Sequence, residues 1–201
     1  MNRKFAAAVL CGIAAFCGTA QEFKTDFAPD SNVPEMTLNR RAKMEDGVLK
    51  IGNWGEGAFS LQVKNPLQIS FRARCVKRHP GKQPSAWIVS LEGAGKESGM
   101  FRFRQDGCLE SYFYKNGQRK GGLIKKIAIP EDGAWFHVCI AIRGDMLSVK
   151  LNGAELGSAK HPGFLSLQKV SFTAYNVEWE IDDLSVAPVS AETERTREKK
   201  G

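Results

Sequence analysis

The stretch from Ala134 to Gly153 constrains the fold more than any other part of this chain. Apolar and polar side chains alternate along Phe136–Arg143 and again along Met146–Leu151. A repeat of two residues is typical of strands that have one buried face. Between the two runs Gly144-Asp145 suits a tight two-residue turn, and Asn152-Gly153 supplies the two positive φ angles that a type I′ turn requires. The stretch therefore predicts a β-hairpin followed by a turn into another short strand.

The same alternation recurs along the rest of the chain, without a long amphipathic helical pattern. Asp106-Gly107 and Asn116-Gly117 mark further turns at the spacing expected of a sandwich or barrel. These signals predict an all-β fold, an antiparallel β-sandwich of the jelly-roll type. The predicted strands are 21–27, 48–51, 58–63, 67–77, 86–91, 100–104, 108–114, 118–129, 136–143, 146–151, 154–157, 169–175 and 177–186. The segment from Asp30 to Asp46 is predicted to be a long loop. In the last strand the apolar positions change parity, which predicts a β-bulge at Asp182-Asp183.

Two segments of the chain resemble a known family. The hairpin, preceded by Trp135 and followed by Asn152-Gly153, resembles the core hairpin of laminin-G-like domains in the concanavalin A-like lectin/glucanase superfamily. The run Ile181–Val186 resembles the strand that closes their jelly roll. The resemblance implies one domain of a secreted bacterial type over residues 21–188, with its last strand pairing back toward the N-terminal strand. It also implies glycan or protein binding on one concave sheet.

The two ends of the chain are predicted to lie outside this domain. Basic residues at positions 3 and 4 precede an apolar run that ends in small residues, the pattern of a signal peptide (residues 1–20) cleaved after Ala20. The run is shorter than the roughly 20 residues of a spanning helix, so no membrane span is expected after cleavage. An uncleaved anchor and a lipoprotein lipidated at Cys11 or Cys17 are the alternatives. Residues 189–201 are expected to be a charged, disordered tail. The protein is therefore expected to be secreted, periplasmic or at the cell surface.

Charge and cysteine content exclude several classes of function. The formal net charge of +7 is modest, and charges of both signs are spread along the chain, unlike the basic patch of a nucleic-acid-binding protein. Three cysteines lie beyond the predicted signal peptide, Cys75, Cys108 and Cys139, so at most one internal disulfide can form. Their spacing does not match that of a zinc site.

Three carboxylates in the last predicted strand give the sharpest enzymatic signal. Glu178, Glu180 and Asp182 alternate, so their side chains share one face at intervals of about 7 Å, a separation open to the acid and nucleophile of a glycosidase. The row resembles the three-carboxylate strand of laminarinase-type glycoside hydrolases. There, however, the order is Glu, Asp, Glu and the strand lies mid-chain, whereas this chain has Glu, Glu, Asp near its end. The competing interpretation is an ordinary polar strand face without catalysis.

The same region suggests a metal site. Asp182 and Asp183, together with Asp26 or Asp30 from the N-terminal region, would supply carboxylate oxygens at one place if the two ends of the domain meet. Calcium requires six or more oxygen ligands. The sequence therefore raises calcium as a cofactor, with a solvated acidic bulge as the alternative.

A third set of residues combines rings and positive charge. Arginine beside an aromatic ring suits sugars that bear carboxylate or sulfate. The residues predicted to bind such a glycan are Trp54, Arg72, Arg74, Arg102, Arg104, Tyr112, Tyr114, His137 and Lys150, with Arg143 on the same parity. The prediction assumes that these strands belong to one positively charged sheet. The alternative is that they are solvent faces guarded against edge-to-edge pairing.

Two further features are interpreted as having no direct role in catalysis or in cell adhesion. His137 lies on the non-core parity near Ser148, but no serine sits in a nucleophile elbow, so the histidine is interpreted as a surface residue. Arg143-Gly144-Asp145 spells an integrin-recognition tripeptide, and the need for glycine in the turn explains it. The resulting hypothesis is a secreted, non-catalytic carbohydrate-binding domain with an acidic glycan as partner. The alternatives are a glycoside hydrolase or lyase of the same fold, and a protein-binding adhesive domain.

Overall fold

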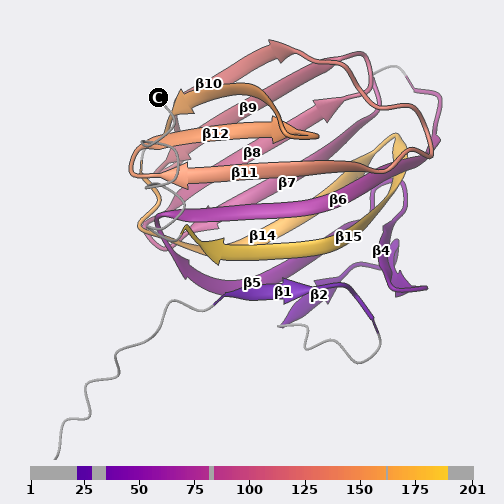
Figure 1. The fold of residues 1–201 in the computed structure, drawn as a ribbon, viewed down its shortest axis with the longest axis horizontal. Coiled ribbons are helices and arrows are strands. Elements are labelled where there is room, and N and C mark those ends of the chain that lie inside the picture. Colours follow the sequence, from indigo (N-terminus) through magenta and orange to yellow (C-terminus); the bar gives the residue numbers. More distant parts are fainter. Residues whose placement is uncertain (1–21, 29–34, 82–83, 162, 190–201) are drawn as a thin grey trace, which may run out of the picture.

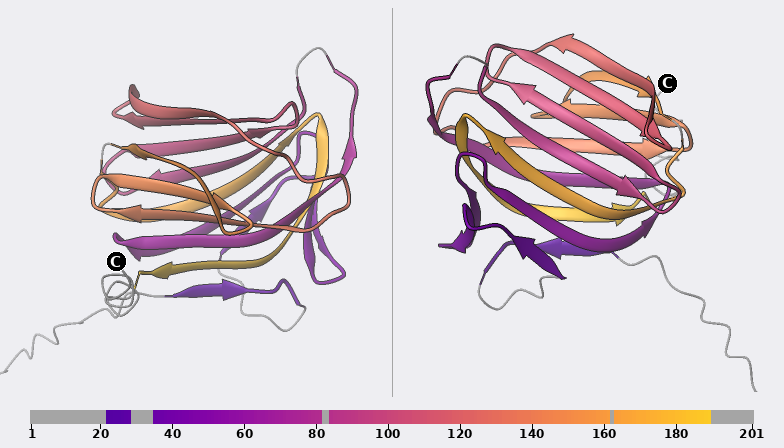
Figure 2. Two further views of the ribbon diagram at one scale, coloured as in Figure 1. Left: turned by 45° about the horizontal axis from the view of Figure 1, so that its top comes forward. Right: turned by 180° about the vertical axis from the view of Figure 1, so that it is seen from behind.

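The computed structural model describes residues 22–28, 35–81, 84–161 and 163–189, which form fifteen strands and no helix. The strands make two antiparallel sheets stacked face to face (Figures 1 and 2). The eight-stranded sheet has the order β13 (Ala154–Lys160), β12 (Met146–Leu151), β11 (Phe136–Arg143), β6 (Leu67–Arg78), β15 (Val177–Pro188), β4 (Val48–Ile51) and β3 (Ala42–Glu45), with β1 (Phe23–Thr25) also paired to β15. The seven-stranded sheet has the order β10 (Gln118–Lys126), β9 (Cys108–Lys115), β8 (Glu97–Arg104), β7 (Ala86–Gly93), β14 (Ser166–Tyr175), β5 (Glu56–Lys64) and β2 (Met36–Leu38). The predicted all-β jelly-roll sandwich is confirmed.

The core lies between the two sheets and follows from the alternation in the sequence. Along β6 the inward residues from Leu67 to Ala73 are completely buried, while the residues between them face outward. Aromatic rings join the sheets across the core. Phe71 of β6 meets Phe172 of β14 edge to face with ring centroids 5.1 Å apart, and Trp87 of β7 lies 5.3 Å from Trp179 of β15. Such pairs add to the hydrophobic stabilisation that comes from burying their area.

The hairpin that dominates the sequence forms as predicted. Ile140 of β11 lies opposite Val149 of β12, and Gly144 in the turn has a positive φ of 58°. Asn152 and Gly153 both have positive φ, of 49° and 82°, as a type I′ turn requires. The chain then continues into β13, which completes this side of the eight-stranded sheet.

β15 holds the eight-stranded sheet together. One of its edges pairs with β6 along most of its length, and the other is shared by β4, at residues 179–181, and β1, at residues 184–186. Between these two partners the register shifts and Asp183 takes a φ of 50°, so the predicted bulge is confirmed. The implied return to the N-terminal strand is also confirmed, since Val186 lies opposite Phe23.

The structure corrects several boundaries. The segment predicted as a loop over 30–46 contains β2 and β3, which are too short for their alternation to stand out. Asp46-Gly47, both with positive φ, make the turn of a β3–β4 hairpin. The strand predicted over 118–129 ends at Lys126, and the first strand covers only Phe23–Thr25.

The predictions for the chain ends lie outside the described residues. These are the signal peptide over residues 1–20 and nearly all of the tail over 189–201. No disulfide joins the described cysteines Cys75, Cys108 and Cys139. No helix in the described ranges is long and apolar enough to cross a bilayer.

Candidate functional site

The residues predicted to bind a glycan are divided between the two outer faces of the sandwich. Strands β6, β11 and β12 of the eight-stranded sheet carry Arg72, Arg74, His137, Arg143 and Lys150, whereas β8 and β9 of the seven-stranded sheet carry Arg102, Arg104, Tyr112 and Tyr114. The prediction of one basic sheet is therefore wrong. Parity along a strand shows that a residue faces away from the core, but not to which sheet its strand belongs.

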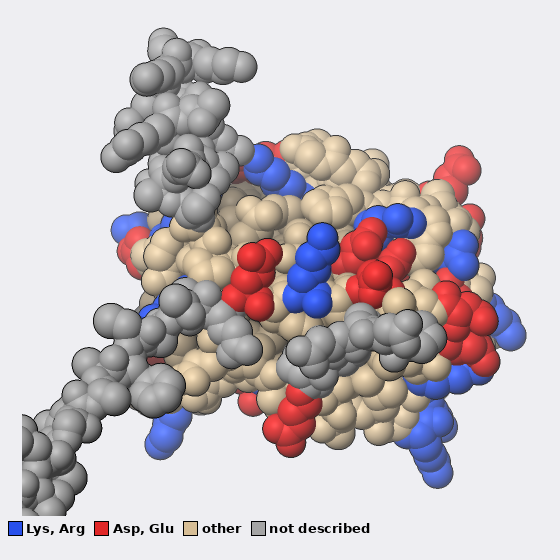
Figure 3. All heavy atoms as spheres, turned by 60° about the horizontal axis from the view of Figure 1, so that its bottom comes forward, with Lys and Arg blue, Asp and Glu red and all other residues tan. Residues whose placement is uncertain are grey.

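On the eight-stranded sheet the arginines are matched by acids. Arg74 donates from Nε and Nη2 to the same oxygen of Glu180, at 2.7 and 2.5 Å. Arg72 lies 3.3 Å from Asp183 and 3.8 Å from Asp182. Both guanidinium groups also lie over the ring of Trp135, at 4.8 Å for Arg72 and 4.6 Å for Arg74. Figure 3 shows the molecule with the bottom of Figure 1 turned toward the reader, and on this side too acidic and basic side chains lie next to one another.

The predicted carboxylate row shares one face of β15, but each member is engaged. Glu178 lies 2.7 Å from Nε2 of His79, and Glu180 is only 8% exposed and bound by Arg74. Burial raises the pKa of Asp182, and repulsion from Asp183 adds to this, whereas the Asp183 N–H that donates to Asp182 opposes it. The row therefore forms polar pairs across the sheet, as expected of the alternative interpretation, an ordinary polar strand face.

The calcium site suggested at Asp182, Asp183 and Asp26 stays a prediction, without a cluster of metal ligands among the described residues. Within the described ranges no three His, Cys, Asp or Glu side chains converge as metal ligands. The oxygens of the predicted ligands have other partners: Asp26 accepts a hydrogen bond from the N–H of Ala28, and Asp183 is bound by Arg72. Asp30 lies outside the described residues.

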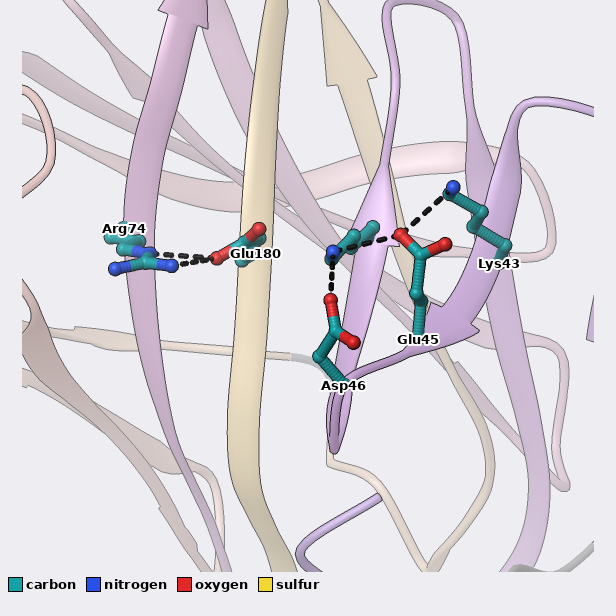
Figure 4. A network of polar contacts seen from close by, with 6 residues as sticks. Lys43, Glu45, Asp46, Arg74 and Glu180 are labelled. Atoms are coloured by element: carbon teal, nitrogen blue, oxygen red, sulfur yellow. Dashed lines mark hydrogen bonds and ion pairs between the residues drawn. The ribbon is translucent and has the colours of Figure 1, made fainter. Parts of the chain in front are cut away.

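A cleft of about 450 Å³ opens on the eight-stranded sheet between the β3–β4 hairpin and β15. Charged side chains provide most of its lining, namely Arg40, Arg41, Lys43, Glu45, Lys50, Glu178 and Glu180, together with Ala42, Ile51, Gly52, Val76 and Trp179. Of these, Lys43, Lys50 and Glu180 lie opposite one another on β3, β4 and β15, and Arg74 of β6 lies opposite Glu180. Figure 4 shows the polar contacts of this row. Hydrogen bonds from Lys50, and then from Lys43, lower the pKa of Glu45 to about 2.

The sequence reasoning missed this cleft because it treated the residues of β3 as part of a loop. A signal was available in Asp46-Gly47, a favoured pair for a two-residue hairpin turn. Reading outward from that pair places Lys43 opposite Lys50, as the structure does. Nothing in the sequence, however, places either lysine beside Glu180, more than a hundred positions away along the chain.

The outer face of the seven-stranded sheet contains the other predicted residues. Arg104 binds Glu110 at 2.6 Å and also pairs with Asp106, and Arg102 lies 3.7 Å from Glu110. The positions beside Glu110 are Arg102 and Ile124 across the sheet, and Cys108 and Tyr112 along β9. The carboxylate near Glu110 is Asp106 of the β8–β9 turn, and Arg104 binds both.

Aromatic rings on this face are held by cations and by one another. The guanidinium of Arg119 lies 4.4 Å from the centre of the Tyr112 ring. The pairing of β10 with β9 shifts register between Arg119 and Gly121, and Gly122 then lies opposite Tyr112. Gly122 has no room for a side chain, because a Cβ there would lie 2.2 Å from the Ser111 carbonyl oxygen.

A second aromatic group borders the same face. Trp54 meets Tyr175 at 4.4 Å, edge to face, and Arg102 lies 5.8 Å from the Tyr175 ring. Trp54 is 51% exposed, which is unusual for so large an apolar side chain. This tryptophan was predicted from the sequence, whereas Tyr175 and Arg119 were not.

The unmatched positive charge of this face lies at its edge. β10 is the last strand of the seven-stranded sheet and carries Arg119, Lys120 and Lys126, which we call the β10 cations. Arg119 and Lys126 lie opposite the outward-facing Tyr114 and Cys108, whereas Lys125 lies opposite the buried Leu109. No described carboxylate forms an ion pair with any of the β10 cations. The arginines of β8, which the sequence reasoning favoured, are by contrast matched by Glu110 and Asp106.

Two other sequence features have structural roles. Asn65 clamps the turn glycine Gly144, donating to its carbonyl at 2.8 Å and accepting from its N–H at 3.2 Å. The Arg-Gly-Asp tripeptide therefore forms a fixed hairpin turn. His137 is exposed, and its backbone N–H donates to Asn152, so its position reflects strand pairing.

Solved structures share this architecture at very low sequence identity. The β-glucanase of Bacillus licheniformis matches with a TM-score of 0.67 at 9% identity, over 84% of this chain and 99% of that one. A Bacillus subtilis protein of unknown function with a galectin-like fold matches with a TM-score of 0.63 at 8% identity, over 85% and 98%. The chain has the concanavalin A-like lectin/glucanase fold.

The carbohydrate-binding module CBM66 from Bacillus subtilis shares this concanavalin A-like fold, with a TM-score of 0.58 at 10% identity over 78% of this chain and 97% of that one. No protein-family model matches the sequence, and no curated protein matches it. At such identities the likeness establishes the fold, while the site must be argued from the residues of this chain.

Proposed function

We propose that this protein binds an acidic glycan, without cleaving it, on the outer face of the seven-stranded sheet. The observation that carries the proposal is the conjunction on one face of the Tyr112–Arg119 pair with the unmatched β10 cations. A ring presents an apolar surface to a sugar, and guanidinium groups bind carboxylate or sulfate in a planar, paired geometry. The fold supports carbohydrate binding, since one solved neighbour is a carbohydrate-binding module and another a β-glucanase.

The arrangement of carboxylates supports binding over hydrolysis. Glycosidases that use two carboxylates place them about 5 to 9.5 Å apart around the scissile bond. On the proposed binding face Asp106 and Glu110 both bind the guanidinium of Arg104, so both carboxylates are already engaged. The rival function, a glycoside hydrolase, rests on Glu178 and Glu180, which line the cleft on the opposite sheet but are bound by His79 and Arg74. We therefore expect no release of reducing ends from uronate polymers or β-glucans.

Export is part of the same proposal. The pattern of a signal peptide over residues 1–20 would bring the protein to the compartment in which acidic polysaccharides occur, whether as a secreted, periplasmic or surface protein. Cell fractionation with an antibody against the mature chain tests this directly, and recovery in the cytoplasm would contradict it.

Affinity measurements on polygalacturonate and a neutral glucan test the proposed face. The double variant Arg119→Ser/Lys126→Ser removes two of the β10 cations, and Lys24→Ser/Lys77→Ser removes the same charge from exposed positions of the eight-stranded sheet. We expect the first variant to bind polygalacturonate about tenfold more weakly, and the matched control to be nearly unchanged. Equal losses in both variants would show a general charge effect and refute the assignment.

Salt and the aromatic ring give two independent checks. Exposed charge contacts weaken as the screening length falls from about 8 Å at physiological ionic strength to about 3 Å at 1 M, so polygalacturonate should dissociate at high salt. Tyr112→Leu keeps an apolar side chain but removes the ring, and should weaken binding about fivefold. Salt-insensitive binding, or equal affinity for the neutral glucan, would contradict the acidic ligand.

A further inference from the structure

The cleft on the eight-stranded sheet has the volume of a small-molecule site. Its volume of about 450 Å³ lies within the range of typical ligand pockets. Gly52 lies in the wall of the cleft, beside Arg41. A Cβ at that position would come within 3.1 Å of the Arg41 carbonyl oxygen, so the backbone is closely packed behind it.

Most charged side chains around the cleft are paired with an opposite charge, and the unpaired positive charge is confined to one part of its lining. The carboxylates are matched, since Lys43 and Lys50 bind Glu45 at 2.9 and 2.8 Å and Arg74 binds Glu180 (Figure 4). Glu178 faces His79 in the same way. Arg40 and Arg41 have no described carboxylate in an ion pair and also line the cleft, so the unmatched positive charge lies with them.

The two arginines differ in how firmly they are held. Arg41 donates from Nη1 to the Asn53 carbonyl at 3.0 Å, and its N–H donates to the Asn39 side chain at 3.0 Å, so its guanidinium is positioned in advance. Arg40 is exposed and has no such described bond. A positioned guanidinium beside a free one suits a carboxylate, because two donors can approach its two oxygens.

The carboxylates of the cleft can serve the rest of such a ligand. Both bonds from Arg74 go to Oε2 of Glu180, and the bond from His79 goes to Oε1 of Glu178. The other oxygen of each carboxylate has no described hydrogen bond and can accept one from a hydroxyl group. The cleft thus offers cations to an acid group and acceptors to hydroxyl groups.

From this arrangement we infer that the cleft is a second ligand site, which takes a single sugar acid such as a uronic acid residue. Its carboxylate lies against Arg40 and Arg41, and its hydroxyl groups donate to Glu178 and Glu180. The site is on the other outer face of the sandwich from the β10 cations. The inference therefore stands or falls separately from the proposed function.

Calorimetric titration of the whole chain with D-glucuronate and D-glucose, each to about 20 mM, tests the inference in the range of a weak single-residue site. We expect glucuronate to bind and glucose not to bind detectably. Arg40→Ser removes an exposed charge and should weaken glucuronate binding about fivefold or more. Gly52→Ser should weaken it by displacing the Arg41 segment, whose carbonyl oxygen would lie 3.1 Å from the added Cβ. Circular dichroism establishes that this variant is folded; if it is not, Arg40→Ser still decides.

The matched control is Lys24→Ser, which removes one exposed positive charge from β1, outside the cleft, and should leave glucuronate binding unchanged. Binding that survives Arg40→Ser and Gly52→Ser but is lost in Arg119→Ser would place the sugar acid on the seven-stranded sheet and overturn the inference. Equal binding of glucose, or no binding of glucuronate, would overturn it as well. The first of these results would support the proposed binding face on the seven-stranded sheet, whereas the other two leave the binding of polygalacturonate there to its own test.

Discussion

Replacing Glu180 by glutamine distinguishes a structural carboxylate from a catalytic one by the sign of the change in unfolding free energy. The side chain is almost fully buried and accepts two hydrogen bonds from Arg74, at 2.7 and 2.5 Å. Glutamine has the same shape but no charge. If the carboxylate serves the fold, Glu180→Gln must therefore lower the stability of the protein.

The size of the loss follows from the geometry. A hydrogen bond to a charged group contributes about 1.5–3 kcal/mol net. The side chain of Arg74 is 37% exposed, so solvent screens its charge and reduces that value. The glutamine oxygen also keeps part of the contact. We expect a loss of about 1–2 kcal/mol, which for a chain of this size lowers the Tm by about 2–8 °C.

Urea unfolding followed by tryptophan fluorescence at pH 7 measures this change. Glu45→Gln is the matched control, because Glu45 also binds cations in the same row but at a fully exposed position, and its replacement should leave the midpoint unchanged within error. Release of reducing ends from β-glucans and uronate polymers is assayed on the same samples.

A gain in stability would refute the reasoning. Residues of active sites are often retained at the expense of stability, so replacing them commonly stabilises the fold. If Glu180→Gln stabilised the protein and also abolished a measurable hydrolysis by the wild type, the carboxylate would be catalytic, and the protein would be a glycoside hydrolase.

Three further predictions concern groups whose pKa is shifted. Burial raises the pKa of Asp182 above its ordinary 3.8, so its ionisation costs stability as the pH rises from about 4 through the folded pKa. Asp182→Asn should therefore be at least as stable as the wild type in urea unfolding at pH 7. A marked loss of stability there would contradict the burial argument. Burial, together with the nearby Asp132, raises the pKa of Cys75 to about 11. A thiol reagent should therefore label Cys75 only after unfolding. Rapid labelling of Cys75 in the native protein would contradict this prediction. Burial lowers the pKa of His161, whereas the charge of Asp145 acts to raise it, so stability should fall as the pH drops from about 6.5 through the folded pKa. His161→Gln should reduce the dependence of the unfolding free energy on pH in this range. An unchanged dependence would assign it to other groups.

Length decided which strands could be predicted from the sequence. β6 and β11, with eight or more residues in alternation, were evident, because the period of two repeats several times within each. β2 and β3, with three and four residues, repeat it too few times to be separated from a loop. The bulge at Asp182-Asp183 was predictable because it shifts an apolar pattern that is otherwise regular.

The candidate sites could be predicted only in part. Alternation placed Arg74 and Glu180 away from the core, but their contact joins strands that are distant in sequence. It likewise placed Arg102 and Arg72 on outer faces without showing that these faces are opposite ones. What makes a charge available to a ligand is whether a neighbour already neutralises it, and for Arg104 and Arg74 that neighbour was visible only in the fold.

The position of β15 has a consequence for how the chain is made. Of the described strands it is synthesised last, yet it lies inside the eight-stranded sheet, where it joins the β3–β4 hairpin and β1 to β6. Until it leaves the ribosome, β6 has an unpaired edge that shorter products and neighbouring nascent chains can occupy. The eight-stranded sheet therefore closes only once β15 has been made, through contacts between distant parts of the chain that form slowly. A product truncated before Val177 would keep the strands of the seven-stranded sheet, but its other sheet would be divided between β6 and β4.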